Sequence, residues 1–376
     1  MKKFTCLILV LLLIACNAPF VFAEDGGAMK FSDDEIQLSL AAAENMMLTS
    51  GAAYETAQFN LKSNKAKTRS YYENVDDLYS MKDYGLQASK SQRALVDALA
   101  TFAQTQTQRN YDAEMNQITR DTVSTYYQLA QAKEALRISN DNVAVQEKLY
   151  QNTQSKFNLG VVSKQDVLNA EIGLNEAKVN AEKMENTYAS ARMGFNLSFG
   201  YDLMQNINIT DTLDEAEMCA TPLEDAIASA LENRNEIKGA EFGLNTATLK
   251  VEANASKVSR TSAQYRSDEA TLMNAQTNAV NAPKSIEMDV RNKYMDMVQK
   301  KSAVELGKLN VENAKETYRL ANLQYDAGMA TLTDTQQAQL GAYQAELNYY
   351  TTLLDYNLAI IDYEQSMTVG TKSIQF

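Results

Sequence analysis

The sequence predicts an all-α protein made of long coiled-coil helical hairpins in two tandem structural repeats. Two turns with the same residue pattern lie far apart in the chain, flanking residues repeat at a constant offset, and apolar residues recur every seven positions. The composition agrees, because only three of the 376 residues are proline and the mean hydropathy is negative. A proline-poor chain of this kind favours long, weakly hydrophobic helices.

The two turns lie at residues 157–166 and 325–334. Each contains a glycine, a hydroxyl residue three positions later, and an aspartate three positions after that: Gly160, Ser163 and Asp166 in the first turn, and Gly328, Thr331 and Asp334 in the second. Glycine accepts the left-handed conformation that ends many helices. A hydroxyl and an acid at this spacing predict a capping box that starts the return helix.

The two turns belong to an internal duplication. An offset of 168 residues relates the turns, and it also relates these pairs of flanking residues: Tyr126 and Tyr294, Lys133 and Lys301, Asn142 and Asn310, Tyr150 and Tyr318, and Gly173 and Gly341. Chance does not maintain such a register over about fifty residues, whereas tandem repeats of one structural unit do. We expect the first repeat to span residues 24–210 and the second residues 211–376.

The N-terminus has the pattern of an export signal. Two lysines at 2–3 precede the apolar stretch 4–15, and Val21-Phe22-Ala23 fits a small-residue cleavage site, which predicts a signal peptide over residues 1–23. The apolar stretch is shorter than the ~20 residues that cross a bilayer as a helix.

A second interpretation of the N-terminus stays open. Leu13-Ile14-Ala15-Cys16 resembles a bacterial lipobox, in which residues 1–15 are removed and Cys16 carries the lipid. Both interpretations predict an exported protein of the cell envelope.

In chain order, Ser32-Asp33-Asp34-Glu35 predicts a capping box that opens a helix toward Lys67. Its counterpart in the second repeat is 221–224, with Pro222 at the first helical position.

The tyrosine-rich segment 70–92 is less regular. A helical pattern then runs from Arg93 to Phe157, about 100 Å at 1.5 Å per residue. Between the repeats, residues 207–210 predict a short strand.

The long helices carry heptad seams. The seam residues are Leu129, Leu136, Val143, Tyr150 and Phe157 in the first repeat, and Met297, Val304, Val311, Tyr318 and Tyr325 in the second. A sustained period of seven indicates coiled-coil packing, and the tyrosines at these positions are expected to pack rather than to bind a ligand. A helix with two apolar seams needs a neighbour on each side, as in a ring or sheet of helices.

Composition excludes several function classes. The net charge of −13 argues against nucleic-acid or anionic-lipid partners, which require a basic face. The chain has no histidine and only three cysteines, which leaves no residues for a histidine-based triad, a zinc site or a disulfide framework. We therefore expect no enzyme activity, no metal and no cofactor.

With these features together, the chain resembles the TolC-like outer-membrane efflux proteins. The similarity rests on the two turns of the form Phe/Tyr-x-x-Gly-x-x-x-x-x-Asp, on residues 226–236 and on Tyr126-Tyr127 before the long helix. The resemblance implies a homotrimer that closes an α-barrel and serves as the exit duct of a tripartite efflux or type I secretion system in the outer membrane. It also implies two partners, a periplasmic adaptor and an inner-membrane ABC or RND pump.

The sequence departs from the family's pattern in two places. Family members insert β-hairpins where this chain has residues 68–92 and 255–285, and neither segment shows the alternating runs that membrane strands need. We therefore expect little or no β-barrel, with the membrane anchor a lipid on Cys16 or a reduced barrel. Ala330 stands where the best-known members carry an arginine, so a gating salt bridge of that kind is not expected.

The resemblance also gives the turn residues a function beyond capping. Asp166 and Asp334 are expected to cap their helices and to form an acidic ring where the barrel narrows, and the two roles are compatible. The alternative function is a non-conducting coiled-coil scaffold or spacer of the envelope derived from the same family.

Overall fold

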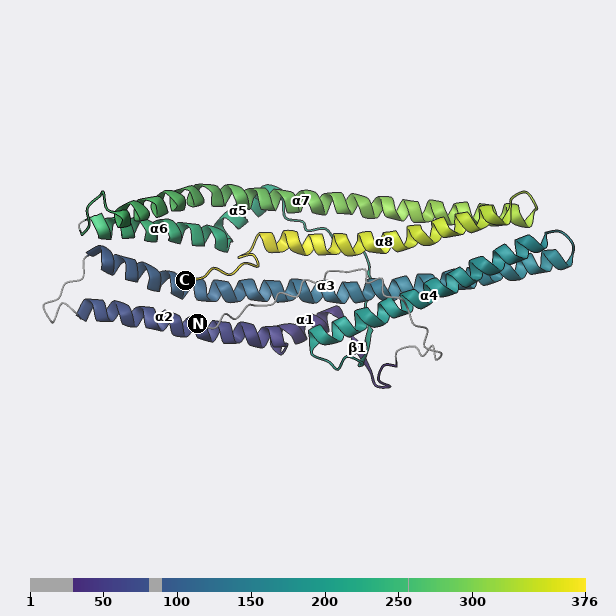
Figure 1. Ribbon diagram of the computed structural model, residues 1–376, viewed down its shortest axis with the longest axis horizontal. Helices are drawn as coiled ribbons and strands as arrows, with labels where there is room; N and C mark the ends of the chain where they lie inside the picture. The colour runs from purple at the N-terminus through teal and green to yellow at the C-terminus, as the bar shows by residue number, and fades with distance from the viewer. Residues whose placement is uncertain (1–29, 81–89, 256) are drawn as a thin grey trace. The chain divides into compact units, whose positions relative to one another are not determined.

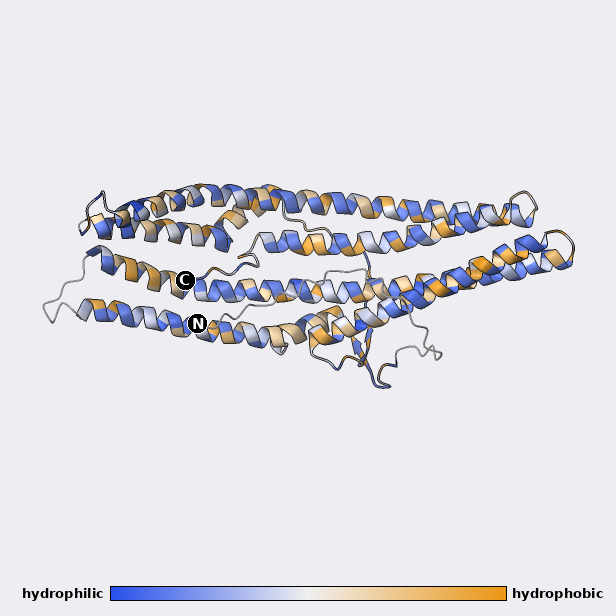
Figure 2. Cartoon of the chain, viewed as in Figure 1, coloured by the Kyte–Doolittle hydropathy of each residue, from blue (hydrophilic) through white to orange (hydrophobic). Residues whose placement is uncertain are grey.

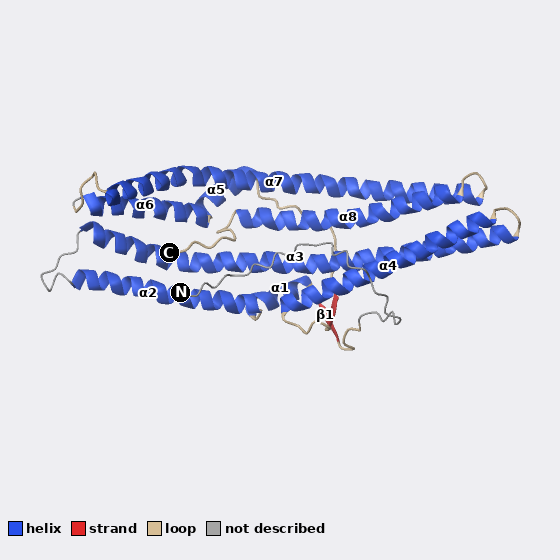
Figure 3. Cartoon of the chain, viewed as in Figure 1, coloured by secondary structure: helices blue, strands red, loops and turns tan. Residues whose placement is uncertain are grey.

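The computed structural model describes residues 30–80, 90–255 and 257–376. The chain divides into the units Met1–Lys30 and Phe31–Phe376, and all the described helices and strands belong to the second. The predicted leader with Cys16 lies outside the described residues. The helices are α1 (Leu40–Thr49), α2 (Ala52–Ser80), α3 (Lys90–Asn158), α4 (Lys164–Phe199), α5 (Leu223–Asn233), α6 (Asn235–Ala255), α7 (Ala263–Asp326) and α8 (Leu332–Ser366), and the strands are β1 (Glu35–Leu38) and β2 (Asn206–Ile209) (Figure 3).

The unit consists of two long hairpins, α3 with α4 and α7 with α8, whose turns lie at the same end (Figure 1). In that half, α3 packs between α4 and α8, and α8 packs against α7. In the other half, α3 packs between α2 and α6, and α6 packs against α7. One side of the unit therefore ends in α4 and α2, and the opposite side ends in α7.

The predicted all-α class and its long helices are confirmed. Helix α3 has 69 residues and α7 has 64, and the described parts of 68–92 and most of 255–285 are helical. The segment 70–80, expected to be irregular, continues α2. Hydrophobic and hydrophilic residues alternate along every long helix (Figure 2). Among the described residues, no helix has an apolar stretch long enough to cross a membrane.

The predicted capping box at Ser32 is wrong. Residues 35–38 form strand β1, and α1 begins at Leu40 with Ser39 as its N-cap, whose hydroxyl accepts from the Ala42 amide at 3.2 Å. The Ser32 hydroxyl instead accepts from the backbone amide of Asn206 at 3.1 Å. Pairing with a strand 171 positions away in sequence thus overrides the local capping pattern.

Strand β1 pairs in parallel with β2, which confirms the strand predicted between the repeats. Asp211, just after β2, fixes this junction to two helices. Its Oδ2 accepts from the Leu40 amide at 2.5 Å and lies 2.9 Å from the buried hydroxyl of Tyr126 on α3. In the second repeat, Pro222 is the N-cap of α5 rather than its first helical residue, a shift of one position.

The duplicated lysines both hold the segment that joins the repeats. Lys133 on α3 donates to the Asn208 side chain at 2.8 Å and to the Ile209 carbonyl at 2.9 Å. Lys301 on α7 pairs with Glu215 of the same segment. The main core lies at this level of the helices, where Tyr126, Phe195, Tyr356 and Tyr363 are fully buried.

Candidate functional site at the two hairpin turns

The two turns have the same backbone geometry. Gly160 and Gly328 both have a φ of +74°, so each ends its helix in the left-handed conformation expected from the sequence. In each turn the amide after the glycine donates back to the helix, from Val161 to the Lys156 carbonyl at 2.9 Å and from Met329 to the Gln324 carbonyl at 2.8 Å. These bonds satisfy carbonyls that the helix end leaves unpaired.

Both predicted capping boxes are present. The carboxylate of Asp166 accepts from the Ser163 amide at 2.9 Å, and that of Asp334 accepts from the Thr331 amide at 3.0 Å. In return each hydroxyl accepts from the amide of its aspartate, at 3.2 Å in both turns. The hydrogen bond from the Thr331 hydroxyl, followed by that from its amide, holds the pKa of Asp334 below its usual value. This aspartate therefore stays charged at neutral pH.

A cationic link that the sequence analysis missed joins the two hairpins beside the turns. The Lys156 ammonium lies 3.6 Å from the centre of the Tyr325 ring and donates to the Tyr325 carbonyl at 2.8 Å. It also pairs with Asp326 at 3.2 Å, and the Asn152 amide donates to the same carboxylate at 2.7 Å. The Thr153 hydroxyl lies 2.8 Å from that of Tyr325. The two turns are thereby held level with each other.

A signal for this link was present in the duplication. At the offset of 168, Lys156 corresponds to Gln324, and Asp326 corresponds to Asn158. One copy thus carries the cation and the other the anion at positions where the matching residue is neutral. Because Ala330 stands where family members carry an arginine, no arginine-based salt bridge was expected at the turns. The Lys156 link lies close to that position, but Ala330 takes no part in it.

The duplicated glycines of the return helices differ in their surroundings. A Cβ on Gly173 would clash with Nε2 of Gln336, which donates to the Asn169 carbonyl, whereas a Cβ on Gly341 would meet nothing within 4 Å. Gly173 borders a hollow of about 610 Å³ between α3, α4 and α8, lined by amide side chains together with Ile172, Leu340 and Tyr343. Small residues there let α8 approach α4 closely.

We expect Gly160→Val and Gly328→Val each to destabilise the protein by at least ~1 kcal/mol, because a β-branched side chain strains the left-handed conformation. Gly341→Val is the matched control, since its site is helical and open. Thermal melts of the three variants check this. Equal melting temperatures for turn and control variants would contradict the assigned turn geometry.

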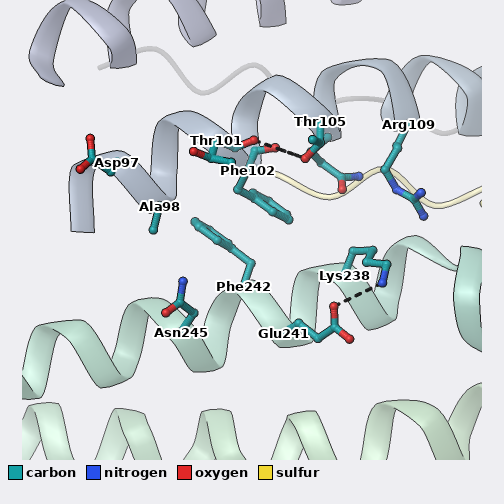
Figure 4. Close-up of a pocket in the computed structure, with 11 residues that line it drawn as sticks. Asp97, Ala98, Thr101, Phe102, Thr105, Arg109, Lys238, Glu241, Phe242 and Asn245 are labelled. Atoms are coloured by element: carbon teal, nitrogen blue, oxygen red, sulfur yellow. Dashed lines mark hydrogen bonds and ion pairs between the residues drawn. The ribbon is translucent and has the colours of Figure 1, made fainter. Parts of the chain in front are cut away.

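A second hollow, of about 690 Å³, lies between α3 and α6 in the half away from the turns (Figure 4). Phe102 and Phe242 stack in it with ring centres 3.9 Å apart, while Lys238 pairs with Glu241 at its edge. Asp97 lies toward one end and Arg109 toward the other. The stacked rings join the first repeat to the second, and the mixture of charges around them selects no ligand class.

The duplicated helical hairpins, joined at one end by their turns, define the class of fold. No known sequence family and no curated protein sequence matches the chain. Solved structures do. The Campylobacter jejuni outer membrane channel CmeC matches with a TM-score of 0.70 at 12% identity, over 90% of this chain and 87% of that one. The Vibrio cholerae outer membrane protein VceC matches at 0.69 and 10% identity, over 89% and 97%.

The open state of the Neisseria gonorrhoeae outer membrane channel MtrE matches with a TM-score of 0.63 at 15% identity, over 89% of this chain and 90% of that one. The predicted resemblance to TolC-like channels is therefore confirmed at the level of the fold. The similarity extends along nearly the whole length of both chains in each comparison.

Proposed function

We propose that the protein is the exit duct of an efflux or secretion system of the cell envelope, assembled as a homotrimer whose helices form the wall of a tube. The observation that carries this proposal is a pair of exposed apolar stripes on the helices that end the two sides of the unit. The fold shared with outer membrane channels supports it.

The stripes lie opposite the buried seams. On α4, Leu168, Ile172 and Val179 are 42%, 55% and 64% exposed, and each lies two positions from a buried alanine at 170 or 177. Two positions rotate about 200° around an α-helix. Helix α7 has a similar set of leucines that are 45–62% exposed: Leu306, Leu309, Leu320 and Leu323. Each lies two positions from a buried or half-buried residue of the heptad seam at 304, 311, 318 or 325. Exposed apolar residues that recur along one face of a helix favour an interaction site there.

The two stripes lie at matching levels. The Lys156 link sets both turns level, and Leu168 lies about one turn into α4 while Leu323 lies about one turn before the end of α7. Ile172 and Leu320 follow one turn further along each helix. A closed ring relates its copies by rotation without translation, so level residues of neighbouring copies meet. We infer that α4 of one copy packs against α7 of the next.

The turns supply the docking end in this proposal. Leu159, Val161 and Met329 project from them with 68–81% of their surfaces exposed. Apolar side chains at the ends of helical hairpins suit contact with the helical tips of a periplasmic adaptor, and through it an inner-membrane ABC or RND pump. The proposal places the protein in the outer membrane or periplasm of a cell with two membranes.

Asp166 and Asp334 would gather into an acidic ring at this end, and such a ring attracts cations and repels anions. We expect planar-bilayer or liposome conductance to be cation-selective in the wild type. The double variant Asp166→Asn/Asp334→Asn should lose that preference while its oligomeric state stays intact. The hydrogen bonds from Thr331 lower the pKa of Asp334, so its contribution to the selectivity should be lost at a lower pH than that of an ordinary aspartate, whose pKa is about 3.9.

Two outcomes would count against this proposal. Unchanged selectivity in the double variant would reduce the aspartates to helix caps. No conductance at all, with the partner pump present and the trimer formed, would favour the scaffold function over the duct.

A further inference from the structure

The hollow of about 610 Å³ between α3, α4 and α8 contains a buried hydrogen-bond acceptor without a partner. Gln146 on α3 is 7% exposed, and its Oε1 accepts no hydrogen bond from any described residue. This oxygen lies 3.3 Å from the place that a Cβ on Gly173 of α4 would take, so it points across the hollow toward α4. A buried acceptor of this kind costs free energy until a donor reaches it.

The internal duplication shows that a helical hairpin does not need this amide. At the offset of 168 residues, Gln146 corresponds to Ala314, whereas Gly173 corresponds to a second glycine, Gly341. The first repeat thus places a polar side chain where the second repeat has only a methyl group. A residue that lowers stability, and that the same fold replaces by alanine in its other copy, indicates a role in binding.

The other polar side chains of the hollow are held in place and nearly uncharged. The Asn142 side chain on α3 accepts from Gln339 on α8 at 2.9 Å, and Gln336 on α8 donates to the Asn169 carbonyl on α4 at 3.2 Å. Of the described residues that line the hollow, Glu176 alone is charged, and it is exposed. The lining therefore favours a neutral ligand with many hydrogen-bonding groups over a metal ion or a polyanion.

A saccharide has the chemistry that complements this lining. Side-chain amides donate through nitrogen and accept through oxygen, and each hydroxyl group can also do both. The C–H faces of a sugar ring are apolar, and Leu340 of α8 and Ile172 of α4 border the amides with apolar surface. The volume of the hollow lies within the roughly 300–1,000 Å³ of small-molecule sites.

We propose that this hollow binds a short neutral saccharide, with a sugar hydroxyl donating to Oε1 of Gln146. The bound sugar contacts α3, α4 and α8, so it joins the first hairpin to the second near the turns. A ligand that binds only the folded chain stabilises it by mass action. The site lies within one chain, so this inference goes beyond the proposed duct and does not depend on the trimer.

Binding of maltotriose, cellotriose and triacetylchitotriose to the full-length protein tests this inference, measured by saturation-transfer NMR and by thermal melts. Gln146→Ala installs the residue of the second repeat and should weaken binding roughly five-fold, the effect of one lost hydrogen bond. Gly173→Ala places a methyl group against Gln336 and should also weaken binding. Gly341→Ala is the matched control, because a Cβ there meets nothing within 4 Å.

We expect at least one of the three trisaccharides to bind the wild type and the Gly341→Ala control equally and to raise the melting temperature of both. Binding that is equally strong in Gln146→Ala and Gly173→Ala would place the sugar elsewhere and overturn the inference. Failure of all three trisaccharides to bind the wild type at millimolar concentration would overturn it as well. Either result would leave the proposed duct standing, because conductance tests the duct independently.

Discussion

Arg234→Met is expected to destabilise the protein by about 3 kcal/mol, because it removes one partner of a buried charge cluster. The Arg234 side chain is 9% exposed, lies between α5 and α6, and pairs with Glu236 at 2.8 Å and Asp289 at 2.9 Å. The methionine fills the volume but leaves Glu236 without its cation, and Asp289 keeps only Lys293, at 3.4 Å. The expected loss lies at the lower end of the range for buried pairs, since Asp289 remains 36% exposed.

The loss should depend on pH. Burial alone would raise the pKa of Glu236, but the hydrogen bond and charge of Arg234 outweigh burial and hold that pKa below its usual value. The stability that the pair contributes is therefore complete above the unfolded pKa of about 4.3 and disappears as the pH falls through the lower folded pKa. The difference between wild type and Arg234→Met should shrink below about pH 4.

Urea unfolding at matched protein concentration, between pH 3 and pH 7, measures this difference. Arg319→Met is the matched control, because Arg319 pairs with Glu316 on the exposed surface of α7 and more than half of each side chain is exposed. The control should unfold with the wild type at every pH. An Arg234 variant that does the same would show that the cluster does not stabilise the fold.

Leu320→Glu is expected to dissociate the assembly into single chains. Leu320 is 45% exposed in the single chain, and the proposed contact buries it against Ile172 of the next copy. An unpaired carboxylate in that apolar seam costs at least ~2 kcal/mol, which weakens each contact roughly 30-fold. A trimeric ring has three such contacts, so the binding free energy lost at each contact adds to that lost at the others.

Light scattering coupled to gel filtration gives the mass of the variant. Asn310→Glu is the matched control, since this exposed residue lies on the same helix outside the stripe and receives the same side chain. The control should keep the mass of the wild type. Circular dichroism with an unchanged helical signal should show that both variants are folded. A folded Leu320→Glu variant that remains assembled would exclude the proposed α4–α7 interface.

The helices and turns were predictable because their causes are local. Gly160 and Asp166, and their copies at offset 168, dictate turn and cap geometry within ten residues, and the heptads dictate which face of each helix is buried. The two exposed stripes were predictable for the same reason. When a helix has apolar residues on two faces, one face packs against a helix of the same chain. The other face stays exposed and needs a neighbour from outside the chain.

The remaining features depend on contacts between distant segments. Ser32 and Glu35 match a capping box as well as a strand edge, and only the presence of β2 decides between them. Arg234 follows a helix end with no local pattern that indicates Asp289, 55 residues away, as its partner. The Lys156 link requires the last turns of α3 and α7 to meet beside the two hairpin turns.

Electron microscopy of the purified mature protein tests the central claim most directly. A trimeric duct should give end-on views with three-fold symmetry and a central opening, and side views in which the helical wall extends on both sides of the core. Single, unassembled pairs of hairpins at micromolar concentration, with lipid or detergent present, would contradict it.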